Sequence, residues 1–262
     1  MTDAQLLPVI WILASMVLAV LVTLFITSAQ LTQLAFTLPG RVLIQFARLV
    51  YYLGIPYTAL LMRAIAPVDM GLTGVSGSVL GWTGAEWLSS VRWGLAAGAL
   101  ALIPIGIAAR QLVHAGYPLG VEARSTGAMI VDGLYTEIHW AFYRTAPLIL
   151  VDSIYVAALL SLGLIGLELL VSLLRNGLGQ QPEERQSWLG TALLLTLSTT
   201  LFVLTRNLWL MIVTHITVEI LLKVWTLHLT RGLNTIQPQP QARSAEPVYD
   251  PDVRPLNKQP EV

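Results

Sequence analysis

Apolar runs long enough to cross a lipid bilayer recur along this sequence, and they restrict its fold more than any other feature does. In the hydrocarbon interior a continuous apolar run of about 20 residues satisfies its backbone polar groups only as a helix. Hydrophobic residues make up 55% of the 262 residues and charged residues only 11%. Soluble domains carry roughly 25% charged residues. We therefore expect an all-α, polytopic transmembrane bundle.

The apolar runs predict about seven membrane spans. They lie at about 8–28, 41–64, 93–113, 125–148, 153–174, 188–205 and 207–227. Before the third span, a segment rich in Gly and Ser that contains Trp82 and Trp87 predicts a loop followed by a short interfacial helix. The expected organisation is an N-terminal part (1–92), a helical core (93–232) and a polar tail (233–262).

The Lys and Arg residues of the short loops predict the orientation of the chain. Most of them fall on the inner side if the N-terminus lies outside. This orientation places the C-terminus of the multi-pass protein in the cytoplasm. We expect the lipid bilayer around it to be the bacterial cytoplasmic membrane. The tail is rich in Gln, Pro and charged residues, which is typical of a segment without a fold of its own. We expect it to contact other subunits of a membrane complex.

Composition also excludes several functions. The net charge is zero and no basic surface is indicated, so nucleic acid is not an expected partner. Cysteine is absent, which excludes disulfides, thiolate metal sites and a cysteine nucleophile.

The stretch YTEIHWAFYR (135–144) places Glu137, His139 and Arg144 inside a predicted span. Ionisable groups at that depth are costly, so they are usually functional or tightly paired. A second stretch, NLWLMIVTHITVE (207–219), repeats this pattern in the last span. We expect the two helices to be buried and to face each other.

Carboxylates and imidazoles that converge from two buried helices can hold a water for general-base hydrolysis. In this interpretation Glu137 activates the water, while His139 or His215 stabilises the oxyanion or protonates the leaving amine. The candidate catalytic residues are Glu137, His139, Arg144, His215 and Glu219. The alternative is that Glu137 with Arg144, and Glu219 with Lys223, only neutralise each other's charge.

Cofactor binding is a further hypothesis. His215 and Glu219, four residues apart, resemble half of a metal site that would suit zinc or iron. Neither HExxH nor the paired Glu-x-x-His of di-iron bundles occurs in the sequence. A membrane histidine can also ligate a haem or chlorophyll-type pigment, for which His139, His215 and His228 are the candidates. Glu168 either approaches this site from the fifth span or bonds locally.

The two stretches resemble the CPBP family, the CAAX-protease and bacteriocin-processing intramembrane endopeptidases. That family carries Glu-Glu-x-x-x-Arg on one helix, aromatic-x-x-x-His on a later helix, and His followed four residues later by Asn on the last. TRNLWLMIVTHITVE is similar to the last motif, with His215 as the family histidine and Glu219 in place of Asn. TEIHWAFYR is similar to the first, with Glu137 and Arg144 as its charged ends.

This resemblance covers about residues 93–230 and implies a CPBP-like helical core. It also implies hydrolysis of a membrane-proximal peptide by a water that Glu137 activates and Arg144 helps to orient. His139 and His215 would then act as stabilisers or acids.

The sequence departs from the family pattern in two places. If Arg144 is aligned, His139 and Trp140 stand where the family has its two glutamates, and the fifth and sixth spans contain no histidine. These departures favour the alternative of a catalytically silent structural or accessory subunit of a larger bacterial membrane complex, energy-transducing or photosynthetic. A transporter is less favoured, because inverted repeats are not evident.

Overall fold

The computed structural model describes residues 3–26, 37–74, 79–114, 125–151, 153–175 and 182–236. Helices account for nearly all of them, and the only β-type pairing in these residues is an isolated bridge between Val79 and Trp82. The elements are α1 (Asp3–Ile26), α3 (Leu38–Leu49), η1 (Val50–Gly54), α4 (Ile55–Leu61), α5 (Gly84–His114), α6 (Thr126–Leu150), α7 (Ile154–Arg175), α8 (Pro182–Thr205) and α9 (Leu208–Ile236). The predicted all-α class is confirmed.

Within the described residues, α3, η1 and α4 follow one another without a break, so the elements form seven helical rods. Three of the helices are long and apolar enough to cross a membrane, over Gly84–Ala108, Ile154–Val171 and Leu208–His228. Shorter apolar helical stretches lie at Leu6–Leu21 and Gly190–Thr205. These features support association with a membrane, although fewer helices meet the length and hydropathy of a span than the sequence predicts.

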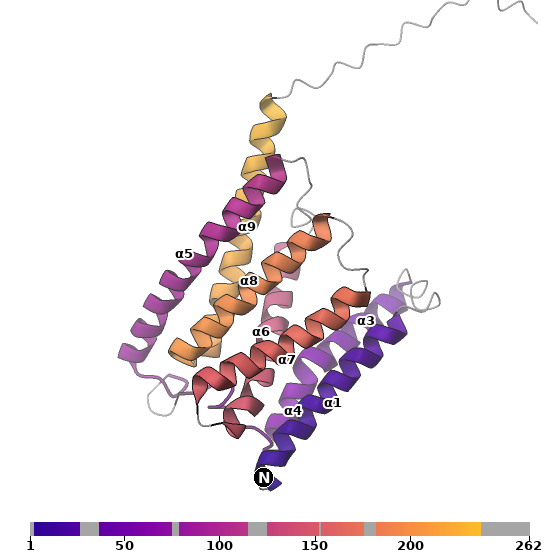
Figure 1. Cartoon of the computed structure of the whole chain (residues 1–262), viewed down its shortest axis with the longest axis vertical. Coiled ribbons are helices and arrows are strands. Elements are labelled where there is room, and N and C mark those ends of the chain that lie inside the picture. The colour runs from indigo at the N-terminus through magenta and orange to yellow at the C-terminus, as the bar shows by residue number, and fades with distance from the viewer. Residues whose placement is uncertain are drawn as a thin grey trace, which may run out of the picture.

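The helix α6 is not among these three, and its position in the bundle explains why it can carry polar residues. It packs against α1, α7, α9 and η1, and Figure 1 shows it behind α7 and α8 in the middle of the bundle. Every residue from His139 to Pro147 is buried. Its polar side chains therefore meet protein neighbours and not lipid, as we expected for the least apolar predicted span.

The helix α5 begins earlier than predicted. Thr83 and Glu86 form a capping box at its start: Oγ1 of Thr83 accepts from the Glu86 N–H at 3.2 Å, and the Glu86 carboxylate accepts from the Thr83 N–H at 2.6 Å. A single helix then runs from Gly84 to His114. The prediction of a separate interfacial helix is therefore wrong. The predicted domain boundary at residue 92 falls inside α5.

Helix α9 is fixed at its first turn by the loop that follows α4. The N–H of Leu208 donates to the carbonyl of Gly71 at 2.9 Å, and the indole N–H of Trp209 donates to the carbonyl of Leu72 at 3.0 Å. Gly71 has a φ of +73°, and a Cβ there would collide with the Arg206 carbonyl. This loop therefore positions the helix that carries His215.

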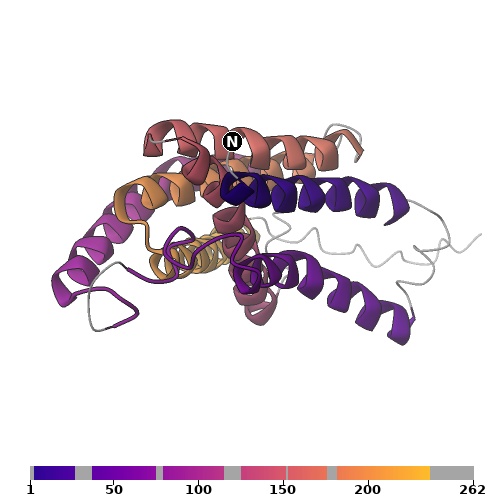
Figure 2. The same cartoon turned by 90° about the horizontal axis from the view of Figure 1, so that it is seen from below.

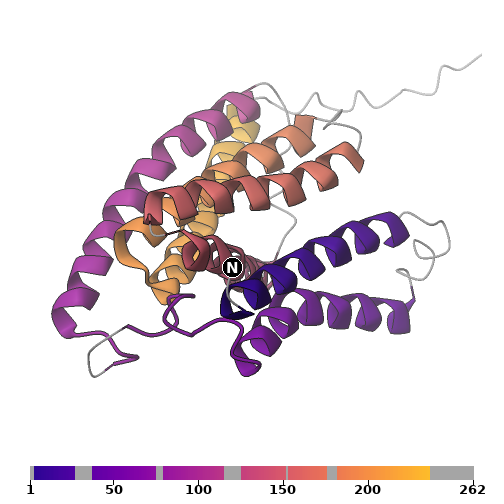
Figure 3. The same ribbon diagram turned by 60° about the horizontal axis from the view of Figure 1, so that its bottom comes forward.

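Two N-terminal rods lie on the side of α6 away from α5. Figures 2 and 3 show α1 and the rod containing α3 as two arms that project from the bundle. The segment 233–262, predicted to be a tail, begins within α9, which continues to Ile236. Residues 237–262 lie outside the described residues.

Candidate active site

Glu137 is the centre of a buried polar cluster formed by three helices. Its Oε1 lies 2.7 Å from Nδ1 of His215 on α9, and its Oε2 accepts a hydrogen bond from Ser198 on α8 at 2.5 Å. Arg144 lies about two turns further along the same helix, and its Nη1 is 3.7 Å from the same Oε2. The side chains of Glu137 and Arg144 are both 0% exposed. A buried carboxylate is tolerated only with such partners, and here both of its oxygens have one.

Arg144 is held by more than its carboxylate partner. It donates to Oγ of Ser198 at 2.8 Å and contacts Sδ of Met211 at 3.6 Å. Its guanidinium carbon lies 5.6 Å from the centre of the Phe202 ring, a cation–π distance. Ser198 accepts from Arg144 and donates to Glu137, so it links the cation to the carboxylate. No sequence pattern identifies Ser198 as part of the site, because a single serine in an apolar helix is common.

His215 is placed between two carboxylates. While Nδ1 faces Glu137, Nε2 lies 3.9 Å from Oε1 of Glu219 in the next turn of α9, longer than a hydrogen bond. The ring centre is 5.7 Å from that of Trp140, and only 5% of the side chain is exposed. The imidazole is therefore fixed in orientation by its Nδ1 contact, with Nε2 directed away from Glu137.

The close approach of α6 to α9 depends on Gly133. A Cβ at this position would lie 2.9 Å from Cγ1 of Ile216 and 3.6 Å from Cδ2 of His215. Such a contact requires Ile216 to move, so the absence of a side chain lets α9 bring His215 within hydrogen-bond distance of α6.

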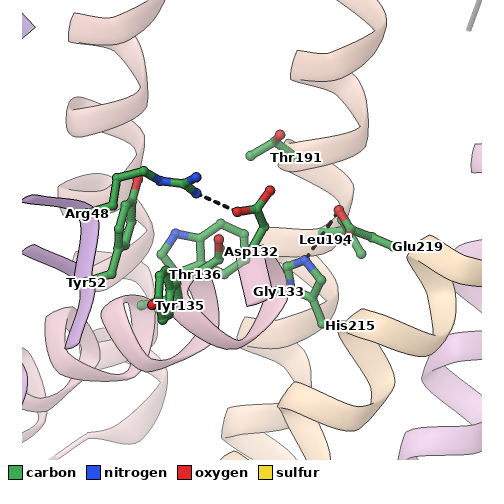
Figure 4. A pocket seen from close by; sticks show the side chains of 11 residues that line it. Arg48, Tyr52, Asp132, Gly133, Tyr135, Thr136, Thr191, Leu194, His215 and Glu219 are labelled. Atoms are coloured by element: carbon green, nitrogen blue, oxygen red, sulfur yellow. Dashed lines mark hydrogen bonds and ion pairs between the residues drawn. The ribbon is translucent and has the colours of Figure 1, made fainter. Parts of the chain in front are cut away.

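A pocket of about 220 Å³ adjoins this cluster. Its lining comes from α3, η1, α6, α8 and α9 and consists of Arg48, Tyr52, Asp132, Gly133, Tyr135, Thr136, Trp140, Thr191, Leu194, His215 and Glu219. Figure 4 shows the ion pair of Arg48 with Asp132, 2.5 Å long, on one side and the contact of His215 with Glu219 on the other. His215 is thus accessible from the pocket, whereas Glu137 lies behind it and does not line it.

His139 does not join this cluster. Two residues correspond to about 200° around a helix, so His139 leaves α6 on nearly the opposite side from Glu137. Its Nε2 lies 3.1 Å from Oε2 of Glu168 on α7, and that carboxylate also accepts from the hydroxyl of Tyr51 at 2.8 Å. The structure therefore brings together four of the five candidate residues and places His139 in a second cluster with Glu168.

The structure gives the cofactor hypotheses little support. Within the described residues, no three His, Asp, Glu or Cys side chains are arranged to hold a metal ion. His215 and Glu219 therefore have no third ligand there for zinc. Of the pigment candidates, His139 and His215 each have a carboxylate on one ring nitrogen, and His228 is exposed near the end of α9.

Comparison with known proteins finds no relative: no family model, no curated protein and no solved structure matches the chain. The interpretation of the site accordingly depends on its own geometry and on the two sequence stretches that resemble the CPBP motifs.

Proposed function

We propose that this protein is a divergent CPBP-like intramembrane peptidase, a multi-pass helical bundle that hydrolyses a membrane-proximal peptide bond with an activated water. The observation that carries the proposal is the 2.7 Å contact between the buried Glu137 carboxylate and Nδ1 of His215, beside a pocket that His215 lines. A carboxylate that fixes an imidazole in this way is the usual support for a histidine that moves protons.

The accessibility of the two groups decides which one takes the proton. Because the pocket reaches His215 and not Glu137, we assign the general base to Nε2 of His215, with Glu137 as the group that orients the ring and compensates its positive charge. This differs from the role that the family resemblance implies for the glutamate.

The reaction then needs one water and no other reactant. The water gives a proton to Nε2 of His215 as its oxygen bonds to the peptide carbonyl carbon, forming a tetrahedral intermediate. The imidazolium returns that proton to the leaving nitrogen as the C–N bond breaks, which yields a carboxylic acid and an amine. Tyr135 and Thr136 have hydroxyl groups in the pocket lining and are candidate donors to the oxyanion. Arg144 and Ser198 hold Glu137 in its ionised form.

The apolar helices support a location in the membrane, and the Lys and Arg residues of the loops support the orientation. We place the protein in the bacterial cytoplasmic membrane with its C-terminus in the cytoplasm. Arg48 and Asp132, at the pocket mouth, belong to the predicted inner ends of their spans. The substrate peptide would therefore enter from the cytoplasmic side.

The experiment that tests this proposal compares peptide termini in membranes of cells that express the wild type, Glu137→Gln or His215→Gln. We expect new termini next to transmembrane segments in the wild type, and their loss in both variants. The matched control is His228→Gln, which alters an exposed histidine of the same helix and should retain the wild-type pattern. If no terminus depends on Glu137 and His215, the peptidase proposal fails.

A second candidate is a catalytically silent subunit of a larger membrane complex. Its support is the pairing of buried ionisable groups, with Glu137 at 0% exposure beside Arg144 and Glu168 bonded to His139. In this case the tail at 233–262 would contact the other subunits. Native purification distinguishes the two functions: a stoichiometric set of chains that co-purifies with the wild type, together with peptide termini that do not change in Glu137→Gln or His215→Gln, favours the subunit.

A further inference from the structure

The π-helix η1 connects the pocket to the second buried cluster. Its successive residues Tyr51 and Tyr52 both contact the ring of His139, but their other partners differ. The hydroxyl of Tyr51 donates to Glu168 on α7 at 2.8 Å. The ring of Tyr52 stacks on that of Tyr135 on α6, with 6.1 Å between centres, and lines the pocket. Such π-helical turns are rare and occur frequently at functional sites.

The rod that contains α3 contributes two residues to the pocket, one just before η1 and one within it. Arg48 stands in the last turn of α3, and Tyr52 follows four residues later on the same face. Arg48 reaches Asp132 of α6 across the pocket, and their side chains are 37% and 26% exposed, which places this ion pair at the pocket mouth. The position of η1 therefore fixes both the mouth and one wall of the pocket.

Next to the pocket lies the second buried cluster, which the proposed chemistry does not use. The ring of His139 is surrounded by Tyr51, Tyr52 and Tyr143, with centre distances of 4.7, 5.2 and 4.5 Å. Glu168 bonds to Nε2 of this histidine, and the hydroxyl of Tyr143 donates to Ser15 of α1 at 3.3 Å. The cluster thus joins η1 to α1, α6 and α7.

We propose that Glu168 and His139 are positioning residues of the pocket: they hold Tyr51, and through it they fix Tyr52 and Arg48 in the pocket wall. What the pocket does rests on the proposed peptidase function, but the positioning itself does not. The arm formed by α3 projects from the bundle (Figures 2 and 3), with Leu38 77% and Phe46 61% exposed. At its C-terminal end the arm continues into η1 and α4, which pack against α1 and α6. The contacts with Glu168 and Asp132 are the side-chain bonds that join this end to α7 and α6 beside the pocket.

The absence of native cysteine permits a direct test of this coupling in the full chain reconstituted in lipid nanodiscs. Thr136→Cys places a thiol in the pocket lining, and Thr126→Cys places one at the exposed start of the same helix. The rate of reaction with a water-soluble maleimide reports how open each position is. In the Tyr51→Phe background we expect the pocket thiol to react about fivefold faster, the ratio that corresponds to one net hydrogen bond. The rate at the exposed thiol should not change.

Glu168→Gln should raise the pocket rate in the same direction. Combining it with Tyr51→Phe should raise the rate by less than the product of the two single effects, because both changes alter the contact between Tyr51 and Glu168. The control background is Tyr155→Phe, an α7 tyrosine that is 70% exposed, which should leave both rates unchanged. The proposal is overturned by any of three results: an unchanged labelling rate of the pocket thiol in Tyr51→Phe, an equal rise in the labelling rates of both thiols, or independent effects of the two substitutions on the pocket rate. Since the readout is labelling, a positive result together with no peptide cleavage by the wild-type protein would reject only the peptidase function.

Discussion

The carboxylate of Glu137 lies 2.7 Å from Nδ1 of His215, although 78 residues separate them in the chain. The contact joins α6 to α9, and both its partners are nearly inaccessible to solvent. Breaking a buried charge pair by neutralising one partner leaves the other charges uncompensated, which typically costs far more than a surface pair is worth.

Neutralising Glu137 should therefore destabilise the bundle. In Glu137→Gln the amide keeps the shape of the side chain, but Arg144 loses its counter-charge in the interior. We expect the free energy of unfolding to fall by about 3–5 kcal/mol, measured by denaturant titration in mixed micelles. The control is Arg92→Gln, which neutralises an exposed charge on α5 and should leave the unfolding midpoint in place. Equal midpoints for the two variants would contradict a buried charged cluster.

Removing the hydroxyl of Ser198 should lower the free energy of unfolding. Ser198→Ala deprives Glu137 of a donor and Arg144 of an acceptor, so we expect a loss of about 1–3 kcal/mol. Ser161→Ala is the matched control, because Ser161 is also fully buried but bonds only to the carbonyl of Ala158 in its own helix. Ser161→Ala should lower the free energy of unfolding by a smaller amount in the same experiment. The proposed bridging role is rejected if the two alanines cost the same.

Two glycines of α6 provide a test of the close packing at the site. Gly133→Ala introduces a Cβ that meets Ile216 and approaches His215, so it should separate α9 from α6. We expect a lower unfolding midpoint and loss of Glu137-dependent peptide termini. Gly127→Ala, with nothing within 4 Å of its added Cβ, should instead stabilise the helix slightly, by up to about 1 kcal/mol. A Gly133→Ala variant that behaves like Gly127→Ala would show that the helices do not depend on this contact.

The start of α9 should be equally sensitive to Gly71. Its φ of +73° and its contact with the Arg206 backbone leave no room for a side chain, so Gly71→Ala should be destabilising by more than about 1 kcal/mol. Gly84→Ala, at an open position, is the control. The indole N–H of Trp209 bonds to Leu72, and the chain has eight tryptophans. The emission of Trp209 is therefore taken as the difference between each protein and its Trp209→Phe counterpart, and it should shift to the red in Gly71→Ala only. Unchanged emission would reject the idea that the loop holds α9.

Local patterns in the sequence were sufficient for the helical architecture. Apolar runs predict helices wherever backbone groups must be satisfied without water, and each predicted run corresponds to a helical rod within the described part of the chain. The starts of α3 and α6 follow local chemistry too, since the hydroxyls of Thr37 and Ser125 accept hydrogen bonds from the first turn. The start of α5 lies earlier than predicted, because the capping box of Thr83 and Glu86 begins the helix within the segment whose glycines and serines predict a loop.

The sequence by itself also determined that α6 must be buried and that its charges need partners, because uncompensated charge is costly in an apolar interior. Which partners they find was decided only by the tertiary structure. Glu137 and His139 differ by two positions, so a helix directs them to different neighbours. Packing of α8 and α9 on one side supplies Ser198 and His215, and packing of α7 and η1 on the other supplies Glu168 and Tyr51. These contacts join residues far apart in the chain, and no local periodicity encodes them.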